Sequence, residues 1–397
     1  MNSKKTGVWL IGAYGDISTT LMVGCHAIHK GLVSDTGLVT ALSPINQLNL
    51  IDLNQLVFGG HDIIDKSVFQ QAEQIGSHSR TFPYTLVQQL QNELEENNKN
   101  TCTLPELSWD PMSPDNTQSS LVELSNLLRE RLRSFIEQNN LDRVVMVNLS
   151  SAEPYIELSE QHDNLDDFEQ LISNDRKDQI LPSMLCAYAA FKEHCSYLNF
   201  SPNIGCAIGS LKDLALRQNT SFYGNDGKTG ETLLKTALAP MFAERNLRIM
   251  SWEGINLLGN GDGKTLSDTE KCKNKVNNKE AVLNNILGYP VHAGVSINYV
   301  PSLGDWKTAW DLIHFQGFLD VPMTMQFTWQ GCDSILAAPL VIDMIRLTDF
   351  ADRNNESGPM HHFACFFKNP IEINEHSLFK QFEMLLKYTY QHLENNN

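Results

Sequence analysis

The stretch 7–32, GVWLIGAYGDISTTLMVGCHAIHKGL, decides the fold class of this 397-residue chain. Its initial run GVWLI is apolar and predicts a buried β-strand. Two glycines, Gly12 and Gly15, follow this run, and a segment with helical periodicity comes next, with Ser18 or Thr19 as a possible N-cap. A strand, a glycine turn and a helix in this order open a dinucleotide-binding βαβ unit.

The glycine turn departs from the G-x-G-x-x-G fingerprint, because Tyr14 and Ile17 stand where the second and third glycines would be. The residues alone therefore leave open an ordinary βα turn that binds no ligand. An acidic residue that could bind the ribose hydroxyls is found further on, where Asp62 follows two glycines at the end of the run QLVFGGHDI.

Helices and strands alternate through the first half of the chain. We expect helices at 121–140 and 181–195, and strands at 143–151 and 203–209. Residues 90–120 are polar and predict a helix end followed by a long surface connection. This alternation predicts an α/β doubly wound fold.

The pattern changes beyond residue 290. Segment 321–330 alternates strictly, and its apolar positions share one face: Val321, Met323, Met325, Phe327 and Trp329. This predicts an antiparallel strand with one buried face, with 293–303 and 311–319 as its neighbours. A second sheet of a different type is therefore expected between residues 235 and 335, followed by a long amphipathic helix over 335–353.

Composition excludes several classes of function. The formal net charge of −17 argues against nucleic acid as a partner, because a phosphate backbone would be repelled. No run of eighteen apolar residues predicts a membrane span, and the N-terminal run predicts a strand rather than a secretory signal. The eight cysteines form no CxxC pair, which favours reduced thiols and a cytoplasmic enzyme. His361 and His362 have no ligand at metal-binding spacing, so no metal is expected.

The segment 224–232, GNDGKTGET, precedes an amphipathic helix and is typical of a phosphate cradle. It is not a Walker loop, because position 222 is Phe rather than Gly. Backbone freedom, hydroxyl groups and one positive charge come from Gly227, Lys228, Thr229, Gly230 and Thr232. The positive end of the following helix would favour an anion, and Asp226 suits a nearby ribose or nicotinamide. A helix merely capped by Thr229 or Thr232 remains the alternative.

Lysines are concentrated in one later segment, at Lys264, Lys271, Lys273, Lys275 and Lys279. A solvated charged loop would explain them. However, Lys275 and Lys279 are four residues apart and would share a helix face, where each ammonium lowers the pKa of the other. A lowered lysine pKa suits general-base catalysis. Lys307 follows a turn, and Lys368 follows an apolar run, FACFF, that predicts a buried strand.

Four motifs together, GNDGKTGETLLK, NLLGNGDG, PSLGDWKTAWD and QGCDSILAAPLVIDMIRL, resemble the inositol-3-phosphate synthase family. The resemblance extends from Gly7 to about Pro370. It implies cyclisation of D-glucose 6-phosphate to 1L-myo-inositol 1-phosphate, for inositol and phospholipid biosynthesis. In this reaction NAD oxidises C5, the ketone enolises, the enolate attacks the C1 aldehyde, and hydride returns to C5.

The resemblance also assigns site residues. The positions implied for NAD are Gly12, Tyr14, Gly15, Asp16, Asp62, Ser151, Asp226, Thr229, Gly230, Thr232, Asn260 and Asp262. Those implied for the substrate are Asn256, Thr229, Gly230, Lys279 and Lys307. Those implied for catalysis are Lys275, Lys279, Lys307, Lys368 and Asp333.

The division of roles is a hypothesis. Lys275 and Asp333 would handle the C5 hydroxyl proton. Lys279 and Lys307 would bind the phosphate and the enolate, and Lys368 would polarise the aldehyde. No metal ligand is implied.

The expected architecture is a split Rossmann domain, 1–232 plus 336–397, with an inserted α+β domain, 233–335, for catalysis and tetramerisation. The resemblance implies a homotetramer. Three rivals remain: a related cyclase for another sugar phosphate, an NAD-dependent oxidoreductase with net redox, and a catalytically silent binding protein. The third would have no need for the four lysines and Asp333.

Overall fold

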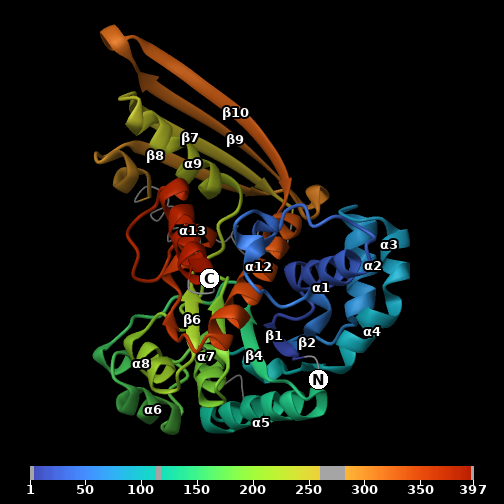
Figure 1. Cartoon of the computed structure of the whole chain (residues 1–397). Coiled ribbons are helices and arrows are strands. Elements are labelled where there is room, and N and C mark those ends of the chain that lie inside the picture. Colours follow the sequence, from blue (N-terminus) through green and yellow to red (C-terminus); the bar gives the residue numbers. More distant parts are fainter. Residues whose placement is uncertain (1–3, 113–117, 260–281, 395–397) are drawn as a thin grey trace.

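The structure is a computed structural model that describes residues 4–112, 118–259 and 282–394. Figure 1 shows a parallel sheet flanked by helices, with a second sheet projecting from it. The chain builds the first sheet, crosses to the second, and returns through two C-terminal helices. Among the described residues, no helix is both long enough and apolar enough to cross a membrane.

The first sheet is parallel, with the strand order β11-β6-β5-β4-β1-β2-β3. Its strands are β1 (Thr6–Ile11), β2 (Leu56–Asp62), β3 (Thr101–Thr103), β4 (Arg143–Asn148), β5 (Ser196–Asn199), β6 (Ser221–Gly224) and β11 (Gly358–Pro359). β1 is buried along its whole length, as a sheet covered on both faces requires. The strand order reverses between β1 and β4, and ligands of such sheets bind at this reversal.

Helices cover both faces of this sheet. They are α1 (Asp16–His29), α2 (Val68–His78), α3 (Tyr84–Gln89), α4 (Gln91–Lys99), α5 (Leu121–Asn139), α6 (Leu165–Ser173), α7 (Pro182–Lys192), α8 (Gly209–Arg217), α12 (Asp333–Arg353) and α13 (Leu378–Glu394). The C-terminal α12 packs against the N-terminal α1, so the two ends of the chain share one hydrophobic core.

The α/β prediction is confirmed, including α5, β4, α7 and α12. The start of the first helix is different: Gly15, not Ser18 or Thr19, is the N-cap of α1, and both hydroxyl residues are buried inside the helix.

Three local predictions are wrong. Residues 203–209 form no strand, because Gly205 has a φ of +51° that interrupts extended backbone; the strand is the preceding β5. Residues 90–120 contain α4 and β3 rather than only a helix end and a connection. The apolar run before Lys368 is a 3₁₀ helix, His361–Phe366, instead of a strand.

The second sheet contains β7 (Arg248–Leu258), β8 (His292–Tyr299), β9 (Trp306–Gln316) and β10 (Pro322–Cys332) in the order β10-β9-β7-β8. The antiparallel pairing of β10 with β9 confirms the prediction from 321–330. The expected pairing with 293–303 is wrong, because β8 pairs in parallel with β7, on the far side of β9. Helix α9 (Gly230–Glu244) packs on one face of this sheet.

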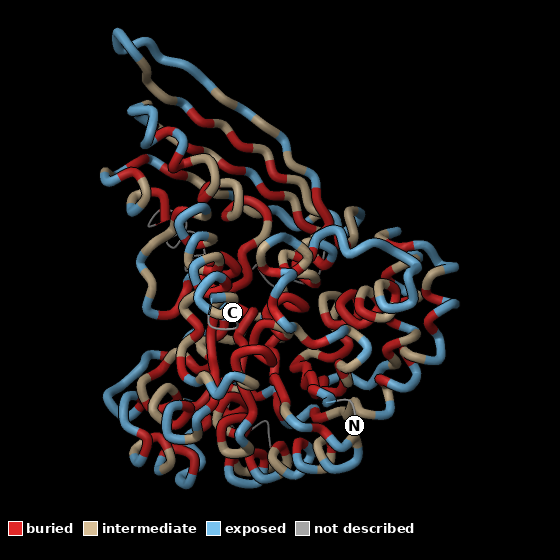
Figure 2. Tube along the Cα trace, in the orientation of Figure 1, coloured by how far each residue is buried: buried red, intermediate tan, exposed pale blue. Residues whose placement is uncertain are grey.

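Burial alternates along the inner strands of the second sheet, as Figure 2 shows. Trp252 and Ile313 are fully buried in the cluster beneath α9, and Met325 and Phe327 of β10 pack against that cluster. Near the outer end of the sheet Met323 remains 39% exposed. The expected apolar face is therefore present but is covered only in part by α9.

Candidate active site

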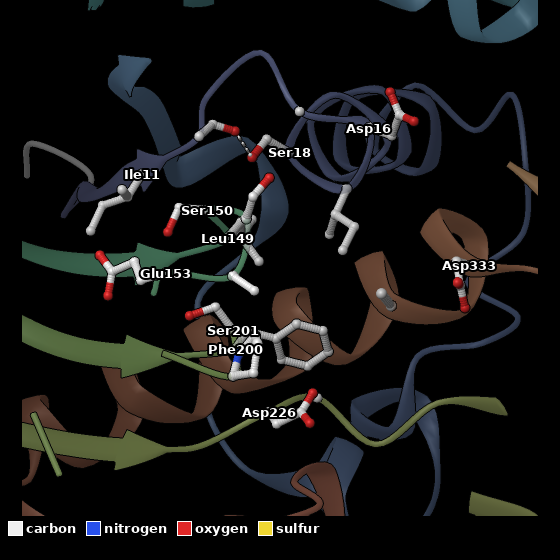
Figure 3. A pocket seen from close by; sticks show the side chains of 18 of the residues that line it. Ile11, Asp16, Ser18, Leu149, Ser150, Glu153, Phe200, Ser201, Asp226 and Asp333 are labelled. Carbon is white, nitrogen blue, oxygen red and sulfur yellow. Dashed lines mark hydrogen bonds between the residues drawn. The ribbon is translucent and has the colours of Figure 1, made fainter. Parts of the chain in front are cut away.

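A cavity of about 650 Å³ lies where the two sheets meet. Its lining includes the loops after β1, β2 and β4, at the carboxyl edge of the parallel sheet. Asn256 of β7, Lys307 of β9 and Asp333 of α12 line its other side. Figure 3 shows Ser18 and Ser150 above Asp226, with Asp333 at the right. The parallel sheet and the second sheet therefore both contribute residues to one site.

The glycine turn lies at the reversal of the parallel sheet. Gly12 has a φ of +79°, and a Cβ there would lie 3.2 Å from the Leu149 carbonyl oxygen. The Ser18 hydroxyl donates to the Gly12 carbonyl at 2.7 Å (Figure 3). The N-cap residue of α1 is Gly15, which has no side chain to cap the helix, and residues 15–18 of this first turn line the cavity. This turn fits a dinucleotide pyrophosphate.

Asp62 joins the end of β2 to this turn. One carboxylate oxygen accepts a hydrogen bond from the Tyr14 N–H at 2.8 Å, and the other accepts one from the Ile63 N–H at 2.8 Å. Burial, with nearby carboxylates, raises the pKa of Tyr14 to about 12. Asp16 also lines the cavity, and its carboxylate accepts from Gln71 at 3.0 Å. Asp62 therefore ties the glycine turn to the end of β2.

The loop after β4 contributes Ser150, Ser151 and Glu153 to the cavity. Figure 3 labels Ser150 and Glu153. The Asn148 side-chain oxygen accepts from the Ser150 hydroxyl at 2.7 Å. Glu153 was not predicted from the sequence. Its carboxylate accepts from both the N–H and the hydroxyl of Ser183, at 2.7 and 2.5 Å, and burial raises its pKa to about 7. An acidic residue just after a strand end was the signal available for it.

The predicted phosphate cradle forms the opposite wall. Asp226, Thr229 and Thr232 line the cavity. Thr229 occupies the N-cap position of α9, but its side chain makes no capping hydrogen bond. Gly230 has a φ of +61°, and a Cβ there would lie 2.5 Å from the Lys307 ammonium nitrogen. The loop is therefore shaped around Lys307 and leaves the Thr229 hydroxyl without a capping role.

Two lysines that are distant in sequence converge on the cavity, each as an ion pair. Lys307 pairs with Asp333, across the junction of β9 and α12. The Lys368 ammonium lies 2.7 Å from an Asp226 carboxylate oxygen. The backbone reinforces the second pair, because the Lys368 N–H donates to the Asp226 carbonyl at 2.7 Å. Lys275 and Lys279, with Asn260 and Asp262, lie outside the described residues.

Two buried residues next to the cradle were not predicted. Glu231 and Lys235 are 3% and 1% exposed, and they form an ion pair of 2.6 Å on α9. Their i, i+4 spacing in GETLLK was the available signal, but it is also typical of solvent-exposed helix faces. The expectation that Lys228 brings a positive charge to the cradle is wrong: its side chain is buried away from the cavity lining and donates to Gln381 of α13, and burial lowers its pKa to about 8. Buried ions of this kind need tertiary partners that a sequence does not reveal.

The fold and the site together indicate the class of enzyme to which the protein belongs. The strand order, the glycine turn and the paired ammonium groups in one cavity define a Rossmann-type enzyme that binds a dinucleotide and an anionic substrate.

Comparison with known proteins is more specific. A family model described as "Myo-inositol-1-phosphate synthase" matches residues 6–389. Inositol-3-phosphate synthase 1 of Bacteroides thetaiotaomicron is 32% identical over 96% of this chain and 94% of its own. A Dictyostelium discoideum inositol-3-phosphate synthase is 28% identical, over 88% and 75%. The chain therefore belongs to the myo-inositol-1-phosphate synthase family of NAD-dependent enzymes.

Two solved structures share the fold. Inositol-3-phosphate synthase of Caenorhabditis elegans superposes with a TM-score of 0.85 at 23% identity, covering 97% of this chain and 85% of its own. A myo-inositol-1-phosphate synthase-related protein of Thermotoga maritima gives 0.76 at 22% identity, covering 97% and 98%. Both likenesses cover 97% of this chain, so the shared fold is not limited to one of its two sheets.

Proposed function

We propose that this chain converts D-glucose 6-phosphate to 1L-myo-inositol 1-phosphate, an isomerisation without net oxidation. The observation that carries the proposal is the convergence of Lys307–Asp333 and Lys368–Asp226 on the cavity that also contains the glycine turn. Family membership supports it, because the relatives bear the name of this synthase.

The residues present fit NAD. Gly12, Gly15 and the first turn of α1 would hold the pyrophosphate, and Asp62 would face the adenosine ribose. Ser151, Asp226 and the Thr229 loop would border the nicotinamide half, and by resemblance Asn260 and Asp262 complete this set. When bound, NAD would take hydride from C5 of the sugar and later return it.

The charged pairs suit the remaining chemistry. We propose that Asp333, with Lys275, handles the proton of the C5 hydroxyl. The Lys307 ammonium, held between Asp333 and Gly230, would stabilise the negative charge that develops on the enolate oxygen and, with Lys279, bind phosphate. Lys368 would donate a hydrogen bond to the C1 aldehyde, making that carbon a better electrophile for ring closure.

One assay tests the function. The protein is incubated with glucose 6-phosphate and a small, known amount of NAD. We expect inositol phosphate in excess over NAD, with no accumulation of NADH, because each hydride is returned. Accumulation of NADH in step with sugar oxidation would indicate a net dehydrogenase instead. Absence of any product would contradict the assignment of glucose 6-phosphate.

We further propose that the chain is a cytoplasmic homotetramer. The partly uncovered second sheet supports subunit contacts through residues 233–335. In this proposal the NAD-binding domain consists of residues 1–232 together with 336–397. The seven cysteines of the described part all carry free thiols, which favours a reducing compartment.

A further inference from the structure

Asn256 lines the cavity, and its amide is hydrogen-bonded to Glu231, which lines the cavity as well. The Asn256 Nδ2 donates to the Glu231 Oε2 at 2.5 Å, and both residues are buried. The other Glu231 oxygen, Oε1, lies 2.6 Å from the Lys235 ammonium. A single carboxylate thus links a helix-borne lysine on α9 to an amide on β7.

This arrangement determines which end of the Asn256 amide is presented. A carboxylate paired with an ammonium is ionised and can only accept hydrogen bonds, so the amide nitrogen must face Glu231. The carbonyl Oδ1 is then the end left for a ligand. Asn256 therefore presents an acceptor to the cavity, although an asparagine could otherwise present either a donor or an acceptor.

The buried ion pair lies in a closely packed environment. Lys235 lies 5.7 Å above the ring of Trp252, whose Nε1 donates to Asp311 at 2.8 Å. Gly254 leaves room for this network, because a Cβ there would lie 2.7 Å from Glu231 Oε1. Charges this deeply buried are costly unless they are paired and well bonded, and removal of one partner is more costly still.

We propose that Glu231 is a positioning residue that fixes Asn256 as a hydrogen-bond acceptor for a hydroxyl group of the sugar phosphate, with Lys235 as its buried counter-charge. This inference rests on the proposed function for the identity of the substrate. The proposal predicts that the site selects ligands with a hydroxyl donor next to Asn256.

A charge-exchange experiment tests it. Asn256→Asp would place two carboxylates against each other and should lower kcat/KM for glucose 6-phosphate on the order of 100-fold. Adding Glu231→Gln moves the negative charge from position 231 to position 256 and restores a donor–acceptor pair, in which the side chain at 256 is still an acceptor. The kcat/KM of the double variant should be at least about 10-fold higher than that of Asn256→Asp. Glu244→Gln, at the exposed end of the same helix, is the matched control and should stay at wild-type activity.

Folding and NAD affinity are measured for each variant. The inference is overturned if the folded double variant is no more active than Asn256→Asp, or if NAD affinity changes while the KM for glucose 6-phosphate does not. Calorimetric binding of glucose 6-phosphate to the NAD-loaded variants repeats the test without turnover. An inactive wild type whose binding still follows this pattern would refute the cyclase and keep the inference.

A second measurement does not depend on the double variant folding. Deoxyfluoro analogues of glucose 6-phosphate replace one ring hydroxyl at a time by fluorine, which cannot donate. At least one should bind worse than glucose 6-phosphate to the NAD-loaded wild type, and that difference should shrink in Asn256→Ala. Equal differences in both proteins for every analogue would contradict the inference.

Discussion

Gly230 shows how a single residue without a side chain shapes the site. Its φ of +61° is in the left-handed region, and its Cα faces the Lys307 ammonium so closely that a Cβ would lie 2.5 Å away. Both constraints act at once: the backbone conformation disfavours other residues, and the space is already filled by the lysine.

We expect Gly230→Ala to cost about 1 kcal/mol of stability through the left-handed backbone and, in addition, to displace Lys307. Because a small misplacement near the reacting atoms is costly, kcat/KM for glucose 6-phosphate should fall roughly 10- to 100-fold. Steady-state kinetics and thermal unfolding of the same preparation measure the two effects separately.

Gly31→Ala is the matched control. Gly31 has a similar φ, +67°, but a Cβ there would meet nothing within 4 Å. This variant should share the loss of stability and keep full activity. Equal losses of activity in the two variants would show that strain, not contact with Lys307, limits the enzyme.

At the scale of elements, the second sheet has one covered and one open face. On β7, Trp252, Gly254 and Asn256 are buried beneath α9, whereas Ile255 between them is 40% exposed. Antiparallel and mixed sheets commonly expose one face, and Ile255 lies on the face through which we propose that the subunits meet.

We expect Ile255→Asp to shift the proposed tetramer to smaller species, because a charge would have to be buried between subunits. Light scattering during size exclusion gives the mass in multiples of the 44.7-kDa chain. Val122→Asp, at an equally exposed apolar position in the first turn of α5, should leave the mass unchanged. An unchanged mass for Ile255→Asp would place the subunit contact elsewhere.

Sequence patterns predicted the elements where local signals were strong. The continuous apolar run identified β1, because a strand buried on both faces is apolar throughout. The helical period identified α5, because a helix buried on one face has apolar residues only on that face. β5 is only four residues long, and the glycine-rich segment after it resembled a strand more closely. The 3₁₀ helix before Lys368 is apolar because its side chains are buried. Hydrophobicity alone does not distinguish such a helix from a buried strand.

At the scale of the whole molecule, the site exists only because segments that are distant in the sequence meet. Lys307 pairs with Asp333 across 26 positions, and Lys368 pairs with Asp226 across 142. Spacing along the chain carries no signal for such pairs, so resemblance to a family, rather than periodicity, suggested these residues. The Glu231–Lys235 pair was missed by both approaches, because its burial depends on how α9 packs against β7.

The central claim is that one molecule of sugar loses and regains the same hydride within a single site. Glucose 6-phosphate carrying deuterium at C5 tests this most directly, with unlabelled NAD and mass spectrometry of the product. The account predicts inositol phosphate that keeps the deuterium at the carbon derived from C5. Deuterium found instead in released NADH, or lost to solvent with unlabelled inositol phosphate formed, would contradict it.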